Sequence, residues 1–248
     1  MNQPPHDPRG SVSVSWGRTL SLRLAWLVVP LVTGYAAWKT GVLALKLSVP
    51  AFCALLLMWG DSPFRRNRDV GWVVLAFAAS LVGDTFLSTR AGRESFYIAG
   101  IAAFFVAHLG YLGFALKNGR IHRLVGAVLL AGYLGWFVLQ LGPAIRSLPL
   151  KLSALAYLLI SCAALAGACG LRLRPAAKLP YVAGLGLIVF SDTLIALSDF
   201  MKVKGVSFLI LPTYYLAQIL VTWAVHCRRG GGEGEAGPFT ERATERTH

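Results

Sequence analysis

The sequence predicts an all-α fold: a polytopic membrane helix bundle of eight transmembrane helices with both termini in the cytoplasm. Hydrophobic residues make up 56% of the chain and charged residues only 14%, whereas soluble domains carry about 25% charged residues. Eight apolar runs follow one another along the 248 residues, each near the length that crosses a bilayer. Lys and Arg gather in the short segments between these runs, which is typical of membrane proteins.

The apolar runs give the expected elements in order: residues 20–38, 42–59, 70–87, 95–116, 124–141, 150–171, 179–198 and 206–227. Each is expected to be a helix, because helices satisfy their own backbone hydrogen bonds in lipid and the alternating pattern of barrel strands is absent. The first run resembles a signal peptide, but a second run follows at once, which favours an uncleaved helix. We therefore expect an eight-helix membrane domain over residues 20–228, a disordered lead over 1–19 and a disordered tail over 229–248.

Positive charge predicts the orientation. With a cytoplasmic N-terminus, fourteen Lys and Arg residues fall on the cytoplasmic side and seven on the other side. The net charge of +13 is spread over these loops and does not follow one helix face, so no nucleic-acid partner is expected. The excess of Arg over Lys and the many Ala and Gly residues suggest a GC-rich bacterial genome, and the expected location is the bacterial cytoplasmic (inner) membrane.

Two acidic residues interrupt the apolar runs. Asp84 lies in the third run and Asp192 in the seventh, each towards the end that the predicted orientation places in the outer half of the membrane. An ionisable group in hydrocarbon costs several kcal/mol and normally has a partner or a task. A purely structural role in joining helices is the alternative. The apolar runs contain few other ionisable residues, so two acids together with His108 favour a functional site.

Further polar side chains recur at helical spacing and are expected to converge with the two acids on one cavity. The four Cys residues have neither zinc-site nor disulfide spacing, so no metal and no cofactor is expected. Phosphate-binding loops, nucleophile elbows and dinucleotide fingerprints are absent from the sequence. The expected supporting residues are Lys46, His108, Tyr111, Ser191, Tyr214, Tyr215 and Gln218.

Several of these residues form motifs that resemble the YhhN-like lysoplasmalogenase family, and the resemblance covers residues 20–228 in layout. The chain departs from the family pattern at Ser198-Asp199-Phe200, where an acid is inserted at the expected outer mouth of the site. The matching residues are Lys46 and Pro50, then Gly83, Asp84 and Leu87, then Gly100, Phe104, His108 and Tyr111, then FSDTLIAL over 190–197, and finally TYYLAQ over 213–218.

The resemblance implies an integral membrane hydrolase that cleaves the vinyl ether bond of lysoplasmalogens to a fatty aldehyde and a glycerophospho-headgroup. Its substrate is a lysophospholipid of the ethanolamine or choline type, bound among membrane lipid. The reaction needs a proton delivered to the alkene carbon and water to attack the resulting cation, so one carboxyl group must be protonated and one ionised. Asp84 and Asp192 are the expected catalytic pair, with Lys46 drawing in the phosphate.

Two other functions fit the same residues. A proton-coupled transporter of small molecules or lipids would also use paired acids and a His within the membrane. A metal-dependent amidase or esterase would use His108 with both acids, although catalytic zinc sites usually take three protein ligands rich in His.

Overall fold

The computed structural model describes residues 28–59 and 67–228, and the regular structure in these ranges is helical. One isolated bridge, between Gly119 and Leu171, joins two loops. The helices are α2 (Val28–Thr40), α3 (Leu43–Met58), α5 (Val70–Thr89), α6 (Glu94–Lys117), α7 (Arg123–Trp136), the π-helix η1 (Phe137–Leu141), α8 (Gly142–Ala144), α9 (Leu148–Cys169), α10 (Pro175–Asp199), the 3-10 helix η2 (Ser207–Leu209) and α11 (Ile210–Cys227).

Six helical segments are long and apolar enough to cross a membrane, which makes the chain an integral membrane protein. They correspond to the third to eighth predicted runs. The first two predicted spans stay predictions: α3 has 16 residues, and the described part of the first run, α2, has 13. The predicted disordered ends, the start of the first run and the cytoplasmic location of the termini lie outside the described residues. The six segments are Val70–Thr89, Glu94–Lys117, Arg123–Ala144, Leu148–Cys169, Pro175–Asp199 and Ser207–Cys227.

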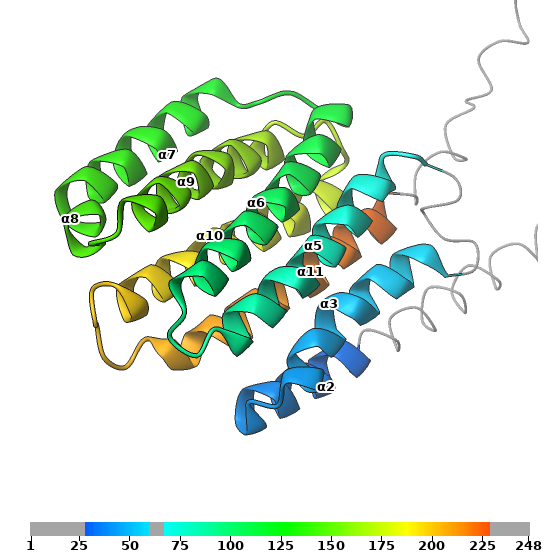
Figure 1. The fold of residues 1–248 in the computed structure, drawn as a ribbon. Coiled ribbons are helices and arrows are strands. Elements are labelled where there is room, and N and C mark those ends of the chain that lie inside the picture. The colour runs from blue at the N-terminus through cyan, green and yellow to red at the C-terminus, as the bar shows by residue number, and fades with distance from the viewer. Residues whose placement is uncertain (1–27, 60–66, 229–248) are drawn as a thin grey trace, which may run out of the picture.

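The helices form one bundle with α7 at one edge and α2 and α3 at the opposite edge (Figure 1). Between these edges, α5 packs against α6, α10 packs against α11, and α9 contacts both α6 and α10. Helix α7 packs on α9 and buries the least of its surface among the six candidate spans. The centre of the bundle is therefore built by α5, α6, α9, α10 and α11.

Small residues let the central helices approach closely. A Cβ atom on Gly110 of α6 would lie 2.5 Å from the backbone oxygen of Trp72 in α5. A Cβ atom on Gly184 of α10 would lie 2.9 Å from the backbone oxygen of Ala217 in α11. Small residues are the usual means of tight packing between helices in membranes, where the hydrophobic effect gives little drive for association.

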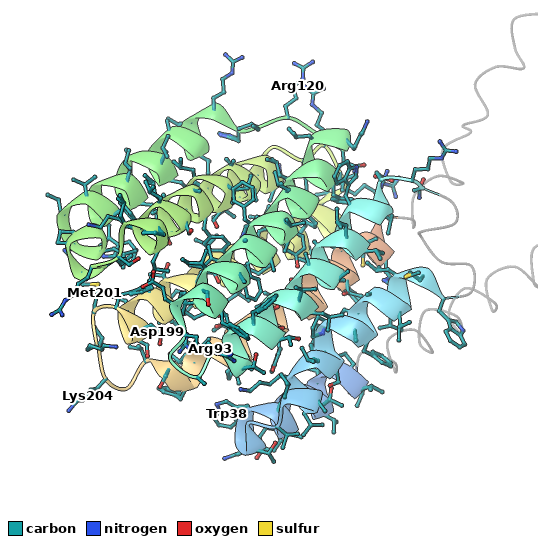
Figure 2. The ribbon with its side chains drawn as sticks, in the orientation of Figure 1. Trp38, Arg93, Arg120, Asp199, Met201 and Lys204 are labelled. Carbon is teal, nitrogen blue, oxygen red and sulfur yellow. The ribbon has the colours of Figure 1, made fainter. Side chains whose placement is uncertain are left out.

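Polar contacts fasten one end of the bundle. Asp69, at the start of α5, forms an ion pair with Arg228 at the end of α11. The side-chain amide of Asn118, at the end of α6, donates a hydrogen bond of 2.6 Å to the same carboxylate. Arg120 lies at this end, whereas Arg93, Asp199 and Lys204 lie at the other end (Figure 2). The residues predicted to lie on opposite sides of the membrane are thus at opposite ends of the bundle, and which end is cytoplasmic stays a prediction.

Candidate active site

Asp192 lies in the wall of an apolar cavity enclosed by α5, α6, α7, α9 and α10, hereafter the Asp192 cavity. The cavity contains about 770 Å³ of empty space, part of it open to the surroundings. Asp192 is its acidic lining residue. The lining residues are Leu87, Tyr97, Ile101, Phe104, Tyr133, Trp136, Leu141, Ala154, Tyr157, Leu158, Ser161, Cys162, Val189, Asp192, Thr193, Ile195, Ala196 and Phe200.

Tyr157 of α9 holds the Asp192 carboxyl group. Its hydroxyl donates a hydrogen bond of 2.6 Å to Asp192 Oδ2. One helical turn further along α9, the Ser161 hydroxyl bonds the Tyr157 backbone oxygen at 2.8 Å. The bond from Tyr157 leaves Asp192 Oδ1 available to a molecule in the cavity and fixes the direction in which the carboxyl group points.

Asp84 of α5 lies behind the wall of this cavity. The hydroxyl of Tyr214 in α11 donates a hydrogen bond of 3.1 Å to Asp84 Oδ2. Phe104 of α6 lines the Asp192 cavity and packs edge-on against Tyr214, with 6.1 Å between the ring centroids. Both acids therefore belong to one region of the bundle, but Asp84 is not among the cavity-lining residues.

The two carboxyl groups are within electrostatic range of each other, and Lys46 of α3 is within range of Asp84. Lys46 is half-buried. Its side chain is therefore placed to compensate a negative charge on Asp84. The expectation that Lys46 draws in a headgroup phosphate remains a prediction, whereas its electrostatic interaction in the structure is with Asp84.

His108 lies at the centre of the aromatic side chains around the two acids. Its Nδ1 is 3.0 Å from the backbone oxygen of Phe104, which accepts a hydrogen bond and so places the proton on Nδ1. Its ring packs edge-on against Tyr157 at 4.9 Å and against Tyr111 at 6.0 Å. The Nε2 atom is buried and has no hydrogen-bond partner within the described residues.

Tyr111 and Gln218 also hold buried polar atoms that the described part of the chain leaves without a hydrogen bond, namely the Tyr111 hydroxyl and the Gln218 amide. Tyr111 lies within electrostatic range of both Asp84 and Asp192. Buried polar groups of this kind are normally satisfied by ordered water. The interior next to the acids is therefore suited to hold water molecules.

Two other predicted site residues contact neighbouring helices. The Ser191 hydroxyl donates a hydrogen bond of 3.0 Å to the backbone oxygen of Ile210, which ties α10 to the start of α11. The ring of Tyr215 faces α2, where a Cβ atom on Gly34 would lie 3.1 Å from it. Tyr215 is still within electrostatic range of Asp84. Neither residue lines the Asp192 cavity.

Sequence reasoning did not identify Tyr157, nor the pair formed by Tyr133 and Thr193, whose hydroxyl oxygens are 3.2 Å apart in the cavity wall. Tyr157 is the sole aromatic residue in its apolar run, between residues 150 and 171. Its isolation among aliphatic residues is the only feature of the sequence that marks Tyr157, and this feature does not indicate which helix the ring faces.

Over residues 28–59 and 67–228, no group of three or more His, Cys, Asp or Glu side chains is arranged to hold a metal ion.

The fold and these residues define an integral membrane helix bundle with a pair of half-buried carboxyl groups at or near a largely apolar cavity. The YhhN family model matches residues 42–225. The chain belongs to the YhhN family, as its motifs predict. Comparison with curated proteins and with solved structures finds no match to this chain.

Proposed function

We propose that the protein is a membrane hydrolase that cleaves the vinyl ether bond of lysoplasmalogens, giving a fatty aldehyde and a glycerophospho-headgroup. The observation that carries the proposal is the position of Asp192, the acidic residue in the wall of a largely apolar cavity. The apolar walls suit the hydrocarbon chain of the substrate. The vinyl ether is the group whose hydrolysis needs an acid, because its alkene carbon must be protonated. Membership of the YhhN family supports the same reaction.

Asp192 is the group that reaches a molecule in the cavity, so we assign the proton transfer to it. Protonated Asp192 gives its proton to carbon 2 of the alkenyl chain, and the ether oxygen shares its lone pair with carbon 1 to form an oxocarbenium ion. The resulting carboxylate accepts a proton from water as the water adds to carbon 1. The hemiacetal then collapses, its hydroxyl proton passes to the glycerol oxygen, and the carbon–oxygen bond breaks to release the aldehyde.

Asp84 acts from behind the cavity wall. In its ionised form, with Lys46 as the compensating charge, Asp84 stabilises the oxocarbenium ion through space. Asp84 and Asp192 are half-buried among mostly apolar side chains, which makes such an interaction stronger than in water. Tyr157 and Tyr214 keep the two carboxyl groups in place through one hydrogen bond each. His108 and Tyr111 do not line the Asp192 cavity, and they support the site from behind Tyr157, against which the His108 ring packs.

The test compares two lysolipids of equal chain length and headgroup, one with a vinyl ether and one with a saturated ether. We expect purified protein in detergent to release fatty aldehyde from the vinyl ether lipid only, because the saturated ether has no alkene carbon to protonate. Cleavage of both lipids would indicate a different hydrolytic chemistry. Absence of aldehyde from both, with uptake of either lipid into sealed proteoliposomes under a proton gradient, would favour the transporter.

A further inference from the structure

The ends of α5 and α10 are joined by a group of polar side chains, here called the rim cluster: Arg90, Tyr97, Asp199 and Lys202. Arg90 binds the Asp199 carboxylate with two hydrogen bonds, 2.8 Å from Nη1 to Oδ2 and 3.3 Å from Nη2 to Oδ1. The Tyr97 hydroxyl donates to Asp199 Oδ2 at 3.0 Å. The Lys202 ammonium donates to the Asp199 backbone oxygen at 2.6 Å. Two cations are thus held around one acid.

The rim cluster borders the Asp192 cavity. The ring of Tyr97 lines the cavity, and the Arg90 guanidinium lies 4.9 Å from the centre of that ring. Phe200, directly after Asp199, also lines the cavity and packs against Tyr97 at 5.4 Å. Asp192 and Asp199 are seven residues apart on α10, so they share one helix face at a rise of roughly 10 Å. The cluster therefore lies about two helical turns from the acid that faces the cavity.

The charge of the rim cluster favours an anion. Arg90 and Lys202 carry two positive charges against the one negative charge of Asp199. Burial alone would lower the pKa of Arg90, but the hydrogen bonds and charge of Asp199 more than offset it, so the pKa is raised and the guanidinium stays charged. Two of its five N–H donors bind Asp199. The Arg90 side chain is 34% exposed, so part of it is accessible to a ligand.

We propose that the rim cluster is the phosphate-binding subsite of the lysophospholipid substrate, with Arg90 as the residue that contacts the phosphodiester. A guanidinium is the side chain best suited to bind phosphate oxygens in pairs. Seven bonds separate carbon 2 of the alkenyl chain from phosphorus, a length of roughly 9 Å when extended. That span places the vinyl ether beside Asp192 when the phosphate lies at Arg90. The inference rests on the proposed function.

The experiment measures aldehyde release from a lysoplasmalogen and from the matching 1-alkenylglycerol, which has the same vinyl ether and no phosphate. In wild type we expect kcat/KM to be higher for the lysoplasmalogen. Arg90→Gln should lower kcat/KM for the lysoplasmalogen by about 10- to 100-fold, mainly through KM, as expected when a charge-assisted pair of hydrogen bonds is lost. Its rate on 1-alkenylglycerol should stay within about twofold of wild type, because that substrate makes no phosphate contact.

Two further variants sharpen the result. Arg93→Gln is the control, because it removes the same charge from the same loop. The Arg93 guanidinium stacks on Phe96, which does not line the cavity. This variant should therefore keep wild-type kinetics on both substrates. Arg90→Gln/Asp199→Asn removes both partners of the ion pair, leaves no unpaired carboxylate and should match Arg90→Gln. The subsite is overturned if Arg90→Gln slows both substrates equally or neither. Absence of cleavage of both substrates by wild type would instead contradict the proposed function.

Competition distinguishes a headgroup from free phosphate. Glycerophosphoethanolamine should inhibit lysoplasmalogen cleavage by wild type at lower concentration than inorganic phosphate, because it also fills the glycerol position. Arg90→Gln should weaken both inhibitors by a similar factor. Equal inhibition of wild type and Arg90→Gln by glycerophosphoethanolamine would show that the phosphate binds elsewhere and would overturn the subsite.

Discussion

Asp192→Asn is expected to lower kcat for lysoplasmalogen cleavage by about 10³-fold, with little change in KM. The amide keeps the shape of the carboxyl group and still accepts the hydrogen bond from Tyr157, but it has no proton to give to the alkene carbon. General acid–base groups contribute about 10²- to 10⁴-fold to rates, and Asp192 both donates to carbon 2 and accepts from water in the proposed mechanism. The measurement is aldehyde release under saturating substrate.

The matched control is Asp69→Asn, which makes the same chemical change at the other end of the bundle, where Asp69 binds Arg228 and Asn118. This variant should keep the wild-type kcat once the amounts of folded protein are equalised by size-exclusion chromatography. A kcat for Asp192→Asn within tenfold of wild type would remove Asp192 from the chemistry and leave it a structural role in bonding α10 to α9.

Asp84→Asn is expected to lower kcat by about 10²-fold while the affinity for the saturated ether lysolipid stays unchanged. Asp84 does not line the cavity, so it makes no contact that a bound lipid would lose. Its effect is on the charged transition state, where removal of one electrostatic stabiliser typically costs 10²- to 10³-fold. Affinity is measured by inhibition with the saturated ether, which binds but has no vinyl group to react.

Tyr214→Phe provides a graded comparison for Asp84. It removes the hydrogen bond to Asp84 Oδ2 but leaves the carboxylate and Lys46 in place. Its kcat should therefore lie between those of wild type and Asp84→Asn. An unchanged kcat for Asp84→Asn with a weaker affinity for the saturated ether would instead assign Asp84 to substrate binding.

The sequence predicts most of the helices because each apolar run is bounded by charged, Pro or Gly residues. The run over 95–116, for example, appears as α6 (Glu94–Lys117), with a charged residue at each end. The same reasoning identified Asp84 and Asp192, since an ionisable group is conspicuous in an apolar run. Their hydrogen-bond partners at Tyr214 and Tyr157 required the structure, because partner choice depends on how helices rotate about their axes.

The cavity walls were the part that sequence patterns did not predict. Helices α7 and α9 supply much of the lining, including Tyr133, Trp136 and Tyr157, yet their runs carry few polar residues to mark one face.

The partner of Asp199 is a second feature that the sequence did not predict. In the sequence Asp199 was an acid inserted at the end of the seventh run, whereas in the structure it binds Arg90, 109 residues away. Long-range pairing of this kind follows from packing and leaves no local pattern.

The most direct test of the account is hydrolysis of a lysoplasmalogen by the wild-type protein in D₂O, with the fatty aldehyde reduced at once to the alcohol and examined by mass spectrometry. Protonation of the alkene carbon predicts one deuterium at carbon 2 of each product molecule, because the proton that Asp192 delivers exchanges with solvent before every turnover. Product without deuterium at carbon 2 would contradict proton delivery to the alkene.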